Sequence, residues 1–148
     1  METSTYDLID EAYASAFARE PLAKFLRVRG ERMSGARLPD HVRVGAPRMC
    51  TRNAWEAVIR YRYQYWEGYG WIPELGFFPF YHAWCVDPET KRVVDPTWHD
   101  APEAVYLGVQ VPAKLLFDIL GASGSFGVFD KGRGFEANTA KIHFGYEA

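Results

Sequence analysis

Scarcity of cysteine, of long apolar runs and of net charge excludes several classes of protein. Cys50 and Cys85 are the only two cysteines among 148 residues, too few for a disulfide scaffold and typical of a reducing cytosol. No apolar segment is long enough to span a membrane. The first residues carry no basic region followed by an apolar run, so no signal peptide is expected. These features together predict a cytoplasmic protein.

The formal net charge of -2 gives no overall field that would attract nucleic acid, although single arginines remain possible phosphate contacts. Internal repeats, low-complexity tracts and glycine-rich phosphate-binding motifs are also missing from the sequence. Nucleic acid is therefore not an expected partner, and no cofactor is expected. The 48% hydrophobic and 16% aromatic composition is ample for a buried core, and residues 1–148 fit one domain.

Residues 81–97 carry the most information about function, because they are typical of a β-hairpin. Two runs rich in β-branched and aromatic residues flank an Asp-Pro-Glu-Thr sequence that suits a type I turn. With Pro88 and Glu89 at the tip, His82 would lie opposite Asp95, with Cβ atoms about 4.5 to 5.5 Å apart. The carboxylate would then fix one imidazole nitrogen and leave the other free as a base.

The remaining requirement is a nucleophile, and Cys50 meets it better than Cys85. Strand side chains alternate, so Cys85 points away from the face of His82. The apolar helical stripe that begins at Cys50 continues through Ala54, Ala57, Val58 and Tyr61. At a helix start the positive dipole end favours thiolate over thiol. A capping-box spacing of Asn53 and Glu56 offers a later start for the same helix, and both starts stay open.

These residues resemble a known superfamily. A Cys at a helix start, His-Ala-Trp on a strand and Asp-Pro-Thr on the next strand are similar to the transglutaminase-like branch of the papain-like cysteine enzymes. The resemblance covers about residues 48–98. The wording Cys-x-x-Asn-Ala, Glu-Gly-Tyr, Val-Asp-Pro-Thr-Trp and Tyr-Leu-Gly-Val is similar to small uncharacterised bacterial and phage proteins of that superfamily. It implies a papain/transglutaminase-like core and a chemistry, but no particular substrate.

Periodicity along the rest of the chain predicts an α+β domain in which N-terminal helices pack on an antiparallel sheet. Turn and capping signals set the expected boundaries, and the segment after residue 121 gives only a weak signal. The expected elements are helices at 5–19 and from Pro21 to Gly30, an arginine-rich loop at 30–48, strands at 62–72 and 104–111, and a helix from Pro112 to Leu120 closed by Gly121.

For several segments the sequence leaves two interpretations open. The 30–48 loop is either a wall of the site or a solvated connector. Alternate aromatic positions of the 62–72 strand, with Glu67 among them, either form a substrate wall or pack the sheet. The expected oxyanion donor is the backbone amide of Cys50, and the candidates for a second donor are Gln64 and a helix-terminal amide.

A structural role for the thiols is the other possibility. A disulfide between the two cysteines and a zinc site from Cys50, His82, Cys85, Asp95 and His99 are both weakened by the opposed strand faces. His41 and His143 lack a partner pattern.

The resulting hypothesis is a Cys50, His82 and Asp95 triad in an acyl-transfer enzyme that forms a thioester with an amide or ester substrate. Water or an amine would resolve it, on a peptide, a protein or a small amide. The alternative is a non-catalytic binding or inhibitor protein with the same fold.

Overall fold

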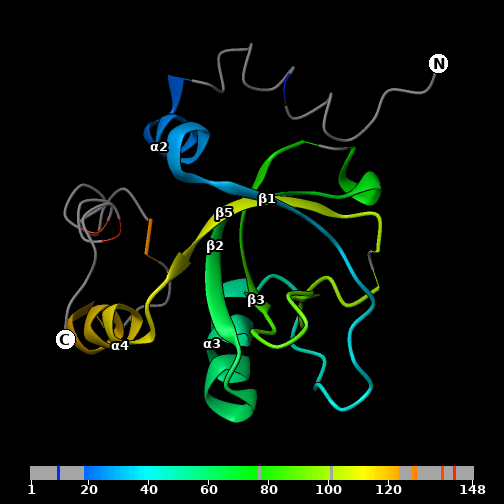
Figure 1. Cartoon of the computed structure of the whole chain (residues 1–148). Coiled ribbons are helices and arrows are strands. Elements are labelled where there is room, and N and C mark those ends of the chain that lie inside the picture. The colour runs from blue at the N-terminus through cyan, green and yellow to red at the C-terminus, as the bar shows by residue number, and fades with distance from the viewer. Residues whose placement is uncertain are drawn as a thin grey trace.

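The computed structural model describes residues 10, 19–76, 78–100, 102–123, 128, 129, 138 and 142, except for the side chains at 75 and 120–123. In this part of the chain three α-helices accompany a curled five-stranded antiparallel sheet, so the α+β class is confirmed (Figure 1). The elements are α2 (Pro21–Arg29), β1 (Glu31–Ser34), α3 (Cys50–Tyr61), β2 (Gln64–Trp71), the 3₁₀ turn η2 (Pro73–Leu75), β3 (Phe80–Val86), β4 (Val93–Val94), β5 (Val105–Val111) and α4 (Ala113–Ser123).

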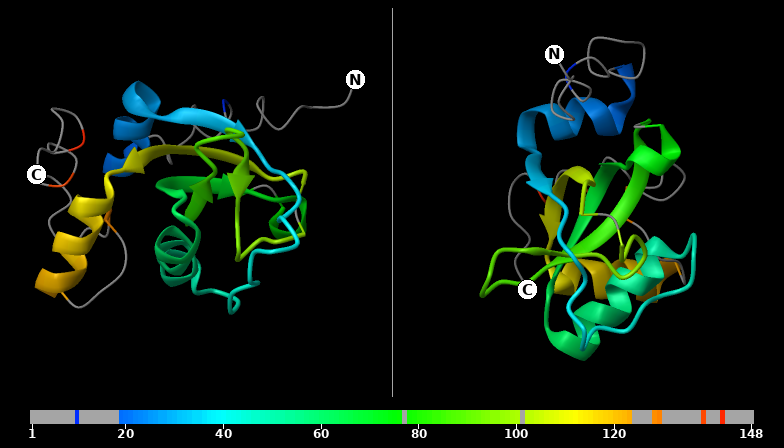
Figure 2. Two further views of the ribbon diagram at one scale, coloured as in Figure 1. Left: turned by 60° about the horizontal axis from the view of Figure 1, so that its bottom comes forward. Right: turned by 90° about the vertical axis from the view of Figure 1, so that its right-hand side faces the viewer.

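The sheet has the strand order β1-β5-β2-β3-β4, and every neighbouring pair is antiparallel. β2 lies at the centre, where residues 64–70 pair with β3 on one side and residues 65–71 pair with β5 on the other. The sheet curls, and α3 lies against it beneath β2 and β3 (Figures 1 and 2). A helix packed on the strand that carries His82 is the arrangement needed to bring Cys50 near it.

One face of the sheet packs against the helices. Tyr65, Tyr69 and Trp71 of β2 belong to the same buried cluster as apolar residues of α2, α3 and α4. Glu67 lies fully buried on this face and accepts hydrogen bonds from the Tyr65 hydroxyl at 2.7 Å and the Val128 amide at 2.8 Å. The aromatic stripe predicted at 62–72 is therefore sheet packing, and Glu67 is a partnered core residue.

The opposite face is covered by aromatic rings rather than by a helix. Its buried cluster includes Trp66, Trp84 and Tyr106, with Trp98 packed against it. Gly108 makes room for one of these rings, since a Cβ there would come within 2.5 Å of Cη2 of Trp84. A glycine in the strand thus lets a large ring lie close to the backbone, and the sheet is buried on both sides.

The predicted bounds agree with the structure for α2 and differ at the end of α4. α2 begins at Pro21 and ends before Gly30, as predicted, and buries Leu22 and Leu26. α4 runs through Gly121 to Ser123, so the expected stop at Gly121 was wrong; its α-helical backbone simply accommodates the glycine. The predicted helix at 5–19, apart from residues 10 and 19, and nearly all of the segment after 123 lie outside the described residues.

The open question of where α3 starts is settled at Cys50. Met49 is the N-cap residue, and Met49 O accepts the first helical bond from the Asn53 amide at 2.8 Å. Asn53 therefore does not cap the helix. Its side chain is buried instead, and Glu56 pairs with Arg52 at 3.2 Å.

The predicted loop at 30–48 contains a strand that sequence reasoning missed. β1 pairs with β5 along four residues, from Glu31 to Ser34. Its side chains are mostly exposed, so it lacks the apolar alternation that marks a half-buried strand. Backbone hydrogen bonds to β5 hold it at the edge of the sheet. The rest of the predicted loop is irregular, as expected.

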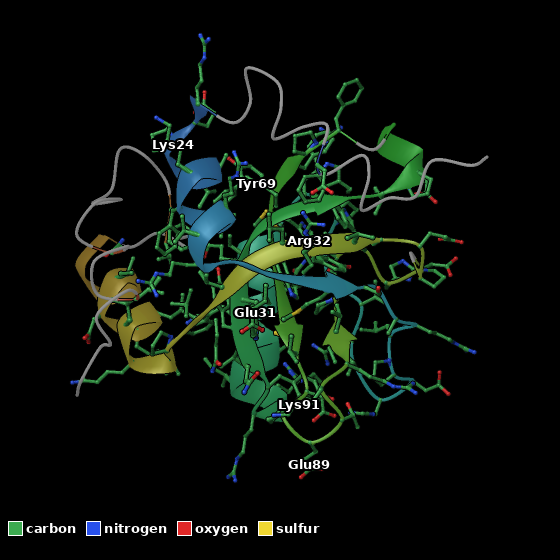
Figure 3. The ribbon with its side chains drawn as sticks, turned by 45° about the horizontal axis from the view of Figure 1, so that its top comes forward. Lys24, Glu31, Arg32, Tyr69, Glu89 and Lys91 are labelled. Carbon is green, nitrogen blue, oxygen red and sulfur yellow. The ribbon has the colours of Figure 1, made fainter. Side chains whose placement is uncertain are left out.

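The hairpin between β3 and β4 has a longer loop than predicted. Cys85 pairs with Val94 and Val86 with Val93, and the Asp87 amide donates to the Arg92 carbonyl at 2.9 Å. The direct opposition of His82 and Asp95 was therefore wrong, because the same register continued places Asp95 beside Trp84. The shift is two residues, which preserves the face of the sheet. Figure 3 shows Glu89 and Lys91 at this loop, far from Lys24 of α2.

The close approach of Trp84 to β5 predicts that Gly108→Ala destabilises the fold. The new Cβ would lie 2.5 Å from Trp84 and 2.6 Å from the carbonyl oxygen of Glu67, so a ring and a strand must both shift. We expect a loss of about 1 to 3 kcal/mol in the free energy of unfolding, measured by urea denaturation. Exposed Gln110→Ala on the same strand is the control and should change it by less than about 0.5 kcal/mol. Equal effects would contradict the close packing.

Candidate functional site

His82 and Asp95 form a buried charged pair. Nε2 of His82 donates to Oδ2 of Asp95 at 2.8 Å, and the two side chains are only 3% and 2% exposed. The pairing that the sequence predicted therefore exists, although the residues are diagonal rather than opposite neighbours. Long side chains span such diagonals. Because Nε2 carries this bond, Nδ1 is the ring nitrogen left for other chemistry.

Asp95 is held by three further donors from two segments. The Tyr106 hydroxyl donates to Oδ2 at 2.8 Å, and the amides of Thr97 and Trp98 each donate to Oδ1 at 3.0 Å. The two amides form an Asx-type turn directly after Asp95. Every oxygen of the carboxylate is thus satisfied, which is the condition for keeping a charge inside the protein.

Trp98 covers one face of the His82 ring. The two ring centroids lie 3.7 Å apart and the planes differ by 11°, which is close parallel stacking. Gly70 allows this position, since a Cβ there would come within 2.5 Å of Cζ3 of Trp98. The indole excludes water from His82 and its π-face favours a positive imidazolium.

Cys50 completes the group from the other side. It is the first residue of α3, is partly buried and packs against the core beneath β3. Its thiol lies near enough to His82 to help raise the pKa of that ring. β4 ends at Val94, so its pairing with β3 stops at Cys85 and does not extend to His82.

The environment of the pair separates the two pKa values. Burial is the largest single influence on His82 and lowers its pKa. The charge and hydrogen bond of Asp95, together with Cys50, outweigh burial and raise the pKa of His82 to about 9. For Asp95, burial acts to raise the pKa, whereas the His82 charge and the hydrogen bonds it accepts lower it overall. The neutral-pH form is therefore an imidazolium beside a carboxylate.

Cys85 lies apart from this chemistry. It is fully buried on the helix-covered face, and its thiol donates to the Ala54 carbonyl of α3 at 3.2 Å. Burial first, and then the charge of Asp95, raise the pKa of this thiol well above its usual value. The prediction that Cys85 sits on the other face as an unreactive thiol agrees with this placement, and both cysteines are free.

The irregular segment after β1 is tied to the site. The Gly45 amide donates to the Pro96 carbonyl at 2.9 Å. The buried side-chain amide of Asn53 bridges the Ala46 carbonyl at 2.8 Å and the Thr97 hydroxyl at 2.9 Å. This segment, α3 and the turn after Asp95 are thereby fixed together, which fits the reading of the loop as a wall.

Other residues singled out from the sequence lie elsewhere. Gln64 pairs with Val86 in the sheet, about 13 Å along β3 from His82, so it is not a second oxyanion donor. His99 is exposed, and His41 bonds the Tyr63 hydroxyl at 3.0 Å. Among the described residues no group of three or more His, Cys, Asp or Glu side chains is placed to hold a metal ion. His143 is not among them.

Sequence reasoning missed three residues that support the site, namely Tyr106, Trp98 and Asn53. Tyr106 reaches Asp95 from β5, a strand that the linear pattern does not connect to the hairpin. The one available signal was the glycines of β2, because isolated glycines in a strand mark a close approach, here by Trp98.

No family model, curated protein or solved structure matches this chain. Within the described ranges, no helix combines the length and apolarity that crossing a membrane requires.

The raised pKa of His82 predicts that folding stability decreases between pH 6.5 and about 9. Across this window the folded state keeps a proton that the unfolded chain has released, so the free energy of unfolding falls as pH rises. The full loss is about 3 kcal/mol at 1.36 kcal/mol per pH unit. Urea unfolding at pH about 6 and about 9.5 measures it. His82→Gln should lack this part of the slope; equal slopes in both proteins would contradict the assignment.

Proposed function

We propose that this protein is a cysteine-dependent acyl-transfer enzyme, with Cys50 as nucleophile, His82 as acid and base, and Asp95 as the residue that orients His82. The observation that carries the proposal is the buried His82–Asp95 hydrogen bond of 2.8 Å, with the thiol of Cys50 beside the same ring. Nucleophile, base and orienting carboxylate in this order are the requirements for covalent catalysis by a thiol.

The first half of the reaction forms a thioester. The Cys50 thiolate attacks the carbonyl carbon of an amide or ester, and the electron pair of the C=O bond moves onto oxygen. When the tetrahedral intermediate collapses, the leaving nitrogen or oxygen takes a proton from Nδ1 of His82. In the second half neutral His82 removes a proton from water or an amine, which attacks the thioester and releases Cys50. Hydrolysis and amine transfer share every protein group in this scheme.

The charge state of His82 supports this direction of proton transfer. With a pKa of about 9, the ring holds its proton at neutral pH and can stabilise a neighbouring thiolate. Asp95 keeps the negative charge because its pKa is lowered. A proton is therefore present on His82 before the leaving group needs one.

Backbone amides at the start of α3 are the candidate oxyanion donors. The first intrahelical bond comes from the Asn53 amide, so the amides of Cys50, Thr51 and Arg52 precede the helical bonding pattern. Together with the positive end of the helix they favour an oxyanion formed on a carbonyl bound at Cys50.

A relation to the transglutaminase-like and papain-like enzymes belongs to the same proposal. It is supported by a helix that starts at the cysteine, by the histidine on an adjacent antiparallel strand, and by the aspartate after the next strand. Peptides, proteins and small amides remain the substrate classes that this chemistry serves.

Selective alkylation tests the nucleophile without a substrate. At pH about 6 an ordinary thiol is almost wholly protonated, so iodoacetamide should modify Cys50 and spare buried Cys85. His82→Ala should slow the labelling of Cys50, because the stabilising imidazolium is removed. Mass spectrometry of peptides reports the two sites separately. A Cys50 rate that ignores His82, or matches that of the unfolded chain, would instead favour a binding or inhibitor protein.

Asp95→Asn separates catalysis from folding. The side-chain amide of the asparagine would present N–H groups toward the donors of His82 and Tyr106, so the imidazole of His82 would lose its orientation. Turnover of a chromogenic acetate ester should therefore fall roughly 10²- to 10⁴-fold. The melting temperature should drop while the protein still folds. Exposed Asp100→Asn is the control and should change neither value. Unchanged turnover in a folded Asp95→Asn protein would refute the role of Asp95.

A further inference from the structure

A groove runs along α3 from a point beside the proposed nucleophile. It encloses about 350 Å³ between the helix and the segment at residues 43–46. Met49 and Asn53, which flank Cys50 on the helix, line one end together with Pro96, the residue after Asp95. Arg60 in the last turn lines the other end, about 15 Å further along the helix axis at 1.5 Å per residue.

The far end of this groove carries positive charge. Arg43 lies there because its amide donates to the Tyr61 hydroxyl at 3.0 Å, next to Arg60 in sequence. The acidic residue in the lining, Glu56, is engaged by Arg52 at 3.2 Å. Within the ranges that the structure covers, no carboxylate forms an ion pair with Arg43 or Arg60. Arg43 and Arg60 thus line the groove without an ion-pair partner among the described residues, while the carboxylate of Glu56 is held by Arg52.

The lining of the groove also has an apolar part. Val44 and Met49 line the groove while 51% and 40% of their surfaces remain exposed. Apolar side chains that line a groove and stay exposed favour an apolar ligand group beside them. A ligand that matches this lining has an apolar portion, which can contact Met49 next to Cys50, and a negative group toward Arg60.

We propose that this groove binds an extended peptide segment of the acyl substrate, with a carboxylate about four residues from the bond that Cys50 attacks, at about 3.3 Å per residue. This inference rests on the proposed function. Guanidinium groups bind carboxylates through paired hydrogen bonds, which gives geometric selectivity as well as charge. A peptide fits better than nucleic acid because the groove also exposes the apolar side chains of Val44 and Met49, and because the chain has a net charge of -2.

A spacer series tests the position of the carboxylate. Iodoacetyl peptides with one to six alanines followed by glutamate or glutamine, with an amidated C-terminus, differ only in one charge at a graded distance. The ratio of the Cys50 alkylation rates for the glutamate and glutamine members should reach about two- to five-fold and peak at three or four alanines. Added salt should lower it.

Matched variants assign the effect to the groove. Arg43→Gln and Arg60→Gln should each reduce the peak ratio toward one. Arg62→Gln removes the same charge just beyond α3 but outside the groove lining, and should leave the peak unchanged. A ratio that declines steadily with spacer length, or one that responds equally to Arg62→Gln, would overturn the proposal. The proposal would also be overturned if an oligothymidylate slowed the alkylation of Cys50 by both peptides equally, and if this inhibition disappeared in Arg43→Gln.

The experiment tests the proposal for the groove independently of the proposal for the triad. At pH about 9.5 an ordinary thiol ionises without help, so the rate ratio in His82→Gln reports the groove alone. A peak that survives in this variant supports the groove whatever the fate of the triad. A ratio of one at every spacer, beside low-pH labelling that depends on His82, would sustain the catalytic proposal and refute the groove.

Discussion

The buried carboxylate of Asp95 is the constraint on which the arrangement of the site depends. A charge inside a protein costs several kcal/mol unless it is paired and hydrogen-bonded. Here the compensation comes from His82 on β3, Tyr106 on β5 and two amides of the following turn. Three separate parts of the chain must therefore meet around one side chain. Their meeting fixes the ring of His82 independently of any substrate.

Glycines in the central strands make this meeting sterically possible. Gly70 leaves the space that the Trp98 ring occupies over His82, and Gly108 does the same for Trp84. The rings in turn keep water from the His82–Asp95 pair, which strengthens its electrostatic interaction. A strand position without a side chain thus contributes to the protonation state of a residue on the neighbouring strand.

The sequence predicted the residues of the site more accurately than it predicted the register of the hairpin. The face shared by His82 and Asp95 was predictable because strand side chains alternate with a period of two, and the loop error of two residues left that face unchanged. The start of α3 at Cys50 was one of two starts that the sequence left open, and it is the one that the apolar stripe favoured. Tyr106 and β1 were not predictable, since a contact between distant strands and an exposed edge strand leave no local periodicity.

Glu67 connects the centre of the sheet to a distant part of the chain. Its buried carboxylate accepts the amides of Val128 and Phe129 as well as the Tyr65 hydroxyl. During synthesis on the ribosome, β2 emerges well before residue 128, so two of these donors are still missing when the sheet could first assemble. Burying Glu67 at that stage would carry a desolvation cost that is offset only later. The core of this protein is therefore expected to close late in translation, after most of its strands and helices have been made.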